Sequence, residues 1–288
     1  RVINLHGDTI YGEVKRIVFE NTPKYWEQLN LHIRTIAKTN DAIHRLLGVG
    51  IAFPGEVSAD RDYVIRSTVL GVKNLSIAEI QKHFSYPVYV EYGANAAGFG
   101  TVWRSKELKD AVYVIVTNNG VAGSIILNNE IYHGRTGRAG AFGHITLNPS
   151  GRKCFCGACG CWSAYNALNA LTGLDETDLD GFFEKVNNED PDAIAKWDEY
   201  LTYFADGLST VSMSFDIDIV IGGPLAVYLE PWLDTIISKM QSRPTLNGEN
   251  ISIHLDTKSE SPMAEGVALM IVAKFLNDEL DNFRFDEL

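Results

Sequence analysis

The chain has 288 residues, of which 45% are hydrophobic and 22% are charged, and its formal net charge is -12 at pH 7. This composition indicates a globular protein of about two domains and excludes a disordered or collagen-like chain. The acidic balance argues against direct binding of nucleic acid. Because neither a membrane-spanning run nor a signal peptide is recognisable, we expect a cytoplasmic protein without a membrane partner.

The first half of the chain alternates segments with strand-like and helix-like patterns. Alternating hydrophobicity marks the strands, apolar residues at helical spacing mark the helices, and the turn sequence His6-Gly7-Asp8 predicts part of a hairpin. In chain order, the expected elements are this hairpin over residues 2–19, a helix over 23–48, a strand over 49–53, a helix over 76–84 and a strand over 88–91. Strands that alternate with helices favour an α/β sheet.

The same kind of pattern restarts after residues 103–109. The expected strands cover residues 111–116, 125–127, 130–132, 217–221 and 251–255, and the expected helices cover 164–171, 190–215, 229–240 and 263–276. This repetition favours two α/β halves. We expect a smaller domain formed by residues 1–104 and about 274–288, and a larger domain formed by residues 105–273.

All four cysteines, Cys154, Cys156, Cys159 and Cys161, lie within one window of eight residues. So dense a cluster is a poor disulfide framework and a good set of metal ligands. Thiolate and imidazole donors suit tetrahedral zinc, and His144 lies shortly before the cluster. We predict a closed, structural zinc site formed by His144, Cys154, Cys156 and Cys161, with Cys159 left over. Two alternatives stay open: ligation by all four cysteines without the histidine, and a set of free thiols.

The cysteine loop and the Gly-His before it resemble the signature of the ROK family of repressors, open reading frames and sugar kinases, in which a histidine and three cysteines bind zinc. Further similar stretches cover nearly the whole chain: residues 50–55, 70–75, 87–91, 94–97, 120–124, 222–223 and 266–269. The resemblance implies a two-domain α/β structure with the actin-like ATPase (ribonuclease-H-like) fold, a sugar cleft between the halves, and a homodimer. It aligns Arg1 with the second strand, so we expect the first strand and its phosphate loop to be missing.

The resemblance also implies where a sugar pocket would lie and how it has changed. Family kinases place an aspartate before Ala-Asn-Ala that takes the proton from the attacking sugar hydroxyl, and this chain has Gly93 there. We do not expect Glu91 to replace that aspartate. Two glutamates that bind sugar hydroxyls correspond to Ala141 and Ser163, and Tyr92 either fills the space of a sugar or packs in the ordinary way. The implied ligand pocket comprises Pro54, Gly55, Ser67, Tyr92, Gly93, Asn95, Ala141, His144 and Ser163.

The implied nucleotide loops are degenerate as well. The family sequence Gly-Thr-Gly-x-Gly-Gly-Gly, whose backbone amides hold phosphate, corresponds to Asn-Asn-Gly-Val-Ala-Gly-Ser over residues 118–124, where side chains intrude. Without the resemblance, the stretch from Gly120 to Ser124 predicts a hairpin. The residues assigned to the degenerate loops are Asn119, Gly120, Gly123, Gly222 and Gly223. We therefore do not expect ATP as a cofactor.

These departures favour a non-catalytic protein, the effector-binding and dimerisation domain of a sugar-responsive transcriptional regulator. We expect a small sugar or sugar derivative as effector and a homodimer. DNA would be contacted only through an N-terminal domain absent from this chain. Two alternatives from other classes are an ATP-dependent hexose kinase of the same family and a zinc-stabilised scaffold that binds no ligand.

Overall fold

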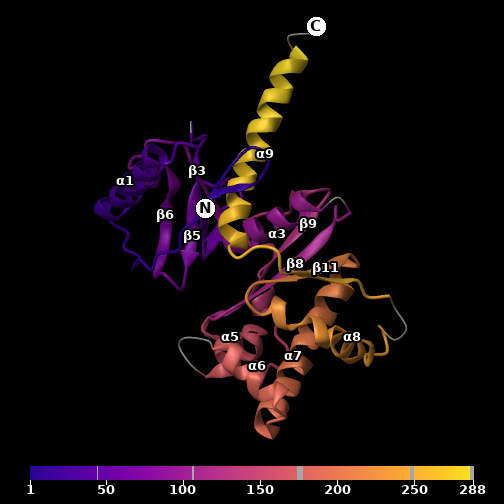
Figure 1. Ribbon diagram of the computed structural model, residues 1–288. Helices are drawn as coiled ribbons and strands as arrows, with labels where there is room; N and C mark the ends of the chain where they lie inside the picture. Colours follow the sequence, from indigo (N-terminus) through magenta and orange to yellow (C-terminus); the bar gives the residue numbers. More distant parts are fainter. Residues whose placement is uncertain (44, 106, 174–177, 247–249, 286–288) are drawn as a thin grey trace. The chain divides into compact units, whose positions relative to one another are not determined.

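The computed structural model describes residues 1–285 apart from 44, 106, 174–177 and 247–249, and it describes side chains up to residue 278. The chain forms two compact units (Figure 1). Unit 1 contains residues 1–105, 133–139 and 261–288, and unit 2 contains residues 106–132 and 140–260. Among the described residues, no helix combines the length and the apolar character that a membrane span requires.

Unit 1 contains three small sheets and four helices among its described residues. Its elements are β1 (Val2–Ile3), β2 (Thr9–Tyr11), α1 (Pro23–Thr39), β3 (Val49–Phe53), β4 (Glu56–Val57), β5 (Tyr63–Ser67), β6 (Val72–Ser76), α2 (Ile77–Gln81), β7 (Val88–Tyr92), α3 (Gly93–Arg104) and α9 (Pro262–Phe285). β1 and β2 pair antiparallel, β3 and β7 pair parallel, and β4, β5 and β6 form an antiparallel meander. The strands expected at 49–53 and 88–91 are confirmed, whereas the meander was not expected.

Helix α1 shows where local chemistry overrides a long periodic pattern. It begins as expected, because the hydroxyl of Thr22 accepts from the backbone N–H of Tyr25 and Pro23 occupies the first turn. The expectation that it continues to residue 48 is wrong. The helix ends at Thr39, since the side chain of Asn40 accepts from the N–H of Ala42 and so offers the backbone a turn in place of a helix.

The close packing of α3 and α9 builds one side of unit 1. A Cβ on Gly266 would lie 1.7 Å from the carbonyl oxygen of Ala96, and a Cβ on Gly100 would lie 3.0 Å from the Cα of Gly266. The two helices therefore touch backbone to backbone. Unit 1 also contains an aromatic core. In it, the ring of Phe19 contacts the rings of Trp26 in α1 and Phe53 in β3.

Unit 2 is built on one mixed sheet with the strand order β10-β9-β8-β11-β12. Its elements are β8 (Ala111–Thr117), β9 (Gly120–Leu127), β10 (Glu130–Ile131), η1 (Phe142–His144), α4 (Ser163–Asn166), α5 (Leu168–Thr172), α6 (Leu179–Asn187), α7 (Pro191–Phe215), β11 (Asp218–Gly222), η2 (Ala226–Tyr228), η3 (Glu230–Trp232), α8 (Leu233–Gln241) and β12 (Ile253–Asp256). β8, β11 and β12 run parallel, and β8, β9 and β10 run antiparallel.

The residues that resemble a phosphate loop form a tight hairpin. Thr117 pairs with Gly120, so the two-residue turn Asn118-Asn119 joins β8 directly to β9. Gly120 and the four residues after it therefore belong to β9, which begins earlier than the expected strand at 125–127. The next turn, at Asn128 and Asn129, has positive φ at both residues, as hairpin turns of type I′ require.

The helices of unit 2 agree with the sequence pattern where caps are strong. Helix α7 begins after Asp190, whose carboxylate accepts from the N–H of Ala193, and it ends at Asp216 with φ of +51°, close to the expected span of 190–215. The expected helix at 164–171 is instead broken at Ala167, where ψ is 147°. Helix α6 was not expected.

The division into units differs from the expected domains at two places. The boundary expected at residues 104 and 105 lies next to the observed division after Ser105. The return to unit 1, expected at about residue 274, comes at Ser261, because α9 begins at Pro262 and packs on α3 from its first turns. The second difference is that residues 133–139 belong to unit 1 although unit 2 flanks them on both sides.

Candidate functional site

A loop in unit 2 brings three of the four cysteines close to the short helix η1. His144 is the last residue of η1, and an isolated antiparallel bridge between Thr146 and Cys161 closes the loop that follows. Gly160 makes the loop possible, because its φ is +76° and a Cβ there would lie 1.7 Å from the carbonyl oxygen of Asn148. The end of the loop is thus held against the residues that follow η1.

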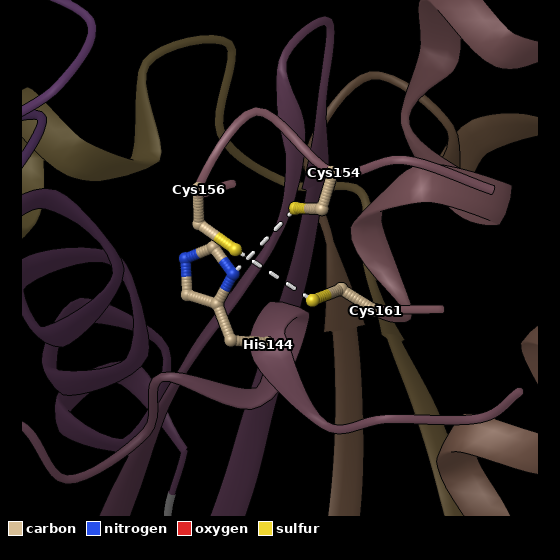
Figure 2. A group of neighbouring side chains, drawn as sticks. All are labelled: His144, Cys154, Cys156 and Cys161. Carbon is tan, nitrogen blue, oxygen red and sulfur yellow. Dashed lines mark hydrogen bonds between the residues drawn. The ribbon is translucent and has the colours of Figure 1, made fainter. Parts of the chain in front are cut away.

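Four side chains point toward a common centre there (Figure 2). The potential ligand atoms of His144, Cys154, Cys156 and Cys161 all lie within 4.8 Å of one another. Sγ of Cys154 is 3.8 Å from Nδ1 of His144, and the Sγ atoms of Cys156 and Cys161 are 3.7 Å apart. Tetrahedral ligands about 2.0–2.3 Å from a zinc ion are separated by roughly 3.3–3.8 Å. The donor set and these two distances therefore fit zinc, whereas a disulfide needs an S–S distance of about 2.05 Å.

The thiols of this group differ in exposure. Cys154 and Cys161 are buried, and Cys156 and His144 are exposed. Burial, together with the neighbouring thiols, raises the pKa of Cys161 to about 12. A buried thiol of this kind ionises when a metal cation lies beside it. Cys159 is exposed and lies outside the group.

The pocket residues assigned to the turn after β3 lie together in unit 1. The hydroxyl of Ser67 donates to the carbonyl oxygen of Pro54 at 2.5 Å and accepts from the N–H of Leu70 at 3.2 Å. A Cβ on Gly55 would lie 2.5 Å from the carbonyl oxygen of Arg66, so only glycine allows this approach. Ser67 therefore holds the turn, and its hydroxyl is engaged within the protein.

Tyr92, Gly93 and Asn95 lie at the junction of β7 and α3 in the same unit. Gly93 is buried and begins α3, and a Cβ there would lie 2.9 Å from Sδ of Met263 in the first turn of α9. Burial raises the pKa of Tyr92 to about 12, so the phenol stays neutral. Asn95 is 2% exposed and its amide donates to Glu91.

Glu91 is a buried carboxylate, 3% exposed, whose two oxygens are both engaged. Oε1 accepts from the N–H of Tyr92 and from Nδ2 of Asn95, each at 2.9 Å. Oε2 accepts from Nε of Arg61 at 3.0 Å and lies 2.9 Å from Nε2 of His133. Burial alone would raise the pKa of this carboxyl, but its partners, first His133 and then Asn95 and Arg61, hold the pKa below its usual range.

The pocket positions assigned to unit 2 differ in their surroundings. Ala141 is exposed and precedes η1. Ser163 is buried, and its hydroxyl accepts from the N–H of Val121 at 3.0 Å and lies 3.3 Å from the carbonyl oxygen of the same residue. A Cβ on Gly120 would lie 2.6 Å from Oγ of Ser163, and a Cβ on Gly143 would lie 2.2 Å from it. Ser163 thus ties α4 to the start of β9.

The glycines assigned to nucleotide loops are surrounded by side chains of unit 2. Gly120 adjoins the turn that contains Asn119. A Cβ on Gly123 would lie 2.4 Å from the ring of Phe142, and a Cβ on Gly222 would lie 1.9 Å from the hydroxyl oxygen of Tyr113. Close packing therefore accounts for glycine at both positions. Gly223 directly follows β11, and its φ of +87° is a conformation that favours glycine.

Three residues that contact Glu91 or Gly93 could not be identified from the sequence. Arg61 and His133 are separated from Glu91 by 30 and 42 residues, and no periodic spacing joins them. Met263 lies still further along the chain from Gly93. The pattern of apolar residues placed β7 and α9 correctly as elements, but it carries no signal for which side chains meet between them.

A sequence profile described as the ROK family matches residues 4–265. The xylose repressor of Caldicellulosiruptor bescii is 30% identical over 159 residues, which are 54% of this chain and 40% of that protein. The glucokinase of Halalkalibacterium halodurans is 31% identical over 115 residues, which are 39% of this chain and 35% of that protein. The aligned regions thus cover less than half the length of these relatives.

A solved structure matches more of the chain. The crystal structure of a ROK family glucokinase from Streptomyces griseus, in complex with glucose and AMPPNP, covers 85% of this chain and 87% of its own, with a TM-score of 0.71 and 25% sequence identity. The expected actin-like ATPase fold is confirmed by this similarity together with the family match.

Proposed function

We propose that this chain, which belongs to the ROK family, is the non-catalytic, effector-binding domain of a sugar-responsive transcriptional regulator. One observation carries the proposal. Where a family kinase would have its proton-accepting carboxylate, this chain has Gly93, and the thioether of Met263 packs against that position. Neither glycine nor a thioether accepts a proton from a sugar hydroxyl.

The nearest buried carboxylate does not supply the missing group. A general base needs a free lone pair within hydrogen-bond reach of the proton it takes. Glu91 uses both oxygens for four partners, and its pKa lies below its usual range, which makes it a weak base. Its hydrogen bonds support a role in holding unit 1 together.

The effector is a small sugar or sugar derivative that differs from the hexoses of the kinases. Ala141 offers no side-chain hydrogen bond, and the hydroxyl of Ser163 is engaged with Val121. A carboxylate that binds a ligand hydroxyl contributes roughly 1.5–3 kcal/mol, so the loss of such groups favours a ligand with fewer recognised hydroxyls. As in a regulator, the domain would form homodimers in the cytoplasm and act on DNA through an N-terminal domain outside this chain.

Zinc has a structural part in this proposal. His144, Cys154, Cys156 and Cys161 would hold it, and the ion would crosslink the cysteine loop to η1. With four protein ligands the ion has no open position, so it would neither activate water nor bind the effector.

The closing test of the proposed function is an ADP-release assay across hexoses and amino sugars, paired with thermal-shift screening of the same sugars. We expect no turnover above background and a raised melting temperature with at least one sugar. Turnover well above background would overturn the proposal in favour of the kinase, which the glucokinase relative and structure favour as second candidate. No thermal shift at millimolar sugar would favour a zinc-stabilised scaffold.

A matched variant sharpens the assay. Gly93→Asp restores the carboxylate, and its Cβ would meet only the flexible end of Met263. We expect the variant to fold and to stay inactive, because the nucleotide loops are still degenerate. If the wild-type protein is inactive and Gly93→Asp phosphorylates sugar, the absence of kinase activity is due to this residue alone, and the nucleotide site is intact.

A further inference from the structure

Residues 133–139, the crossing segment, lie in unit 1 while the chain enters from unit 2 and returns to it. Within the segment, the N–H of Ala139 donates to the carbonyl oxygen of His133 at 3.4 Å, which closes a compact loop. A Cβ on Gly134 would lie 3.3 Å from Cβ of Ala139, so the loop is also packed internally. The contacts that join this loop to the rest of unit 1 involve His133, Gly137 and Arg138.

The first contact, at the start of the segment, joins the side chain of His133 to the buried carboxylate of Glu91. Nε2 of His133 lies 2.9 Å from Oε2 of Glu91, and the side chains are 17% and 3% exposed. An ionised carboxylate can only accept, so this contact is a hydrogen bond when Nε2 of His133 carries a hydrogen; Nη2 of Arg61 also lies 3.2 Å from the same Nε2 atom. Arg61 forms an ion pair with the same oxygen of Glu91, at 3.0 Å. A charge-assisted bond at a site this buried is much less screened than one at the surface.

The second contact lies at the end of the segment and is weaker. Nε of Arg138 is 2.9 Å from Oε2 of Glu56, whose other oxygen binds Arg66 at 2.8 Å, and both arginine side chains are more than half exposed. Next to it, the φ of Gly137 is +82°, and a Cβ there would lie 1.9 Å from the carbonyl oxygen of Val57. The backbone of the segment therefore touches β4, but solvent screens the ion pair.

We propose that Glu91 is a positioning residue that anchors the crossing segment to unit 1 through His133. Along the chain, the segment is followed within a few residues by His144, the first member of the group that could hold a metal ion. This gives the carboxylate a use that is independent of proton transfer. The anchoring does not rest on the proposed function.

The test compares hydrogen exchange in the intact protein and in three variants, without any ligand. Glu91→Gln and His133→Ala each break the pair, and Glu79→Gln is the matched control because Glu79 pairs with Lys82 on the exposed surface of the same unit. We expect amides of residues 133–139 to exchange roughly 10- to 100-fold faster in the first two variants and unchanged in the control. Hydrogen exchange in peptides of β8 in unit 2 reports global unfolding, and its rate should be the same in all variants.

A fourth variant separates anchoring from general destabilisation. His133→Gln keeps an N–H donor for Glu91 while it removes the ring, so it should restore most of the protection that His133→Ala loses. Unchanged exchange of residues 133–139 in His133→Ala, or no rescue by His133→Gln, would overturn the proposal. Since the readout needs neither sugar nor ADP, its outcome is distinguishable from that of the proposed function.

Discussion

The two units contain apolar strands of similar composition that are buried to very different degrees. In unit 2, β8 pairs with β9 on one side and β11 on the other, and none of Ala111–Val116 is more than 2% exposed. In unit 1, β3 pairs with β7 alone among the described strands, and Val49–Ala52 are only partly buried. The backbone neighbours of β8 on both sides thus go together with complete burial, and the single neighbour of β3 goes together with partial burial.

The comparison extends to the way each unit is held together. Unit 2 combines a five-stranded sheet with the long helix α7, whose Trp197, Phe204 and Leu208 are at most 1% exposed. Unit 1 divides its strands among three small sheets, and the carboxylate of Glu91 is buried in it. We expect unit 2 to resist unfolding through apolar packing and its metal group, and unit 1 to depend more on charge.

The largest expected effect concerns the metal group of unit 2. Purified protein should contain about one zinc per chain, and Cys156→Ser should lose it together with local structure, because structural zinc contributes as much as 10 kcal/mol or more. Metal analysis and hydrogen exchange measure both. Cys159→Ser is the matched control, since Cys159 is exposed and lies outside the group. Equal zinc loss in both variants would contradict the assigned ligand set.

A matched pair of core substitutions tests the strand comparison directly. Ile115→Ala in β8 removes a side chain that is 2% exposed and should cost about 2–5 kcal/mol. Ile51→Ala in β3 removes a partly buried side chain and should cost about 1 kcal/mol. Denaturant unfolding followed by segment-resolved hydrogen exchange assigns each loss to its unit. Equal losses would show that β3 is as well enclosed as β8.

Acid should destabilise unit 1 before unit 2. The carboxyl groups with lowered pKa values all lie in the described part of unit 1: Glu13, Glu56, Asp60 and Glu91. The hydrogen bond with His32, opposed by partial burial and assisted by Tyr11 and Lys15, lowers the pKa of Glu13 to about 2.

A carboxyl group whose pKa is lower in the folded protein stabilises the fold at pH values above its pKa in the unfolded chain, which is near 4.5. This stabilisation is lost as the pH falls toward 2. We therefore expect unit 1 to lose protection first between about pH 4.5 and 2, by hydrogen exchange at a series of pH values. Glu13→Gln should flatten part of this dependence, because it removes the titrating group. Earlier loss in unit 2 would reverse the assignment of charge dependence to unit 1.

The smallest expected effect should be the same in both units. Thr22→Ala and Asp190→Ala each remove one helix cap, of α1 and α7, and each should cost about 1 kcal/mol. Helix capping is local, so equal losses from these two variants provide a reference for the difference expected between Ile115→Ala and Ile51→Ala. A much larger loss for one cap, measured by denaturant unfolding, would mean that its unit amplifies local damage.

Much of the fold could be predicted because its signals are local. The apolar runs of β3, β7 and β8 and the capping residue Asp190 lie within the elements they specify. The cysteine group could also be predicted, because three of its members lie within eight residues and the histidine is near. In each case the physical cause and the sequence pattern share one short window.

The rest depends on partners that sequence spacing does not reveal. The pair of Glu91 with His133 spans 42 residues, and the crossing segment follows from that pair, so neither could be expected. The end of α1 was missed because the periodic apolar positions continue past Asn40, whose side chain competes for the backbone. The occupied hydroxyl of Ser163 likewise depends on Val121, on a distant strand.

The packing of α9 on α3 also bears on the order in which the protein is completed during synthesis. Unit 2 has all its residues once the ribosome has passed Glu260, whereas α3 of unit 1 must wait for a helix that begins at Pro262. Until then, the small-residue face around Ala96 has no cover. Domains fold as units while the chain emerges, so unit 1, whose residues lie on both sides of unit 2 in the sequence, receives its last helix after unit 2 is complete.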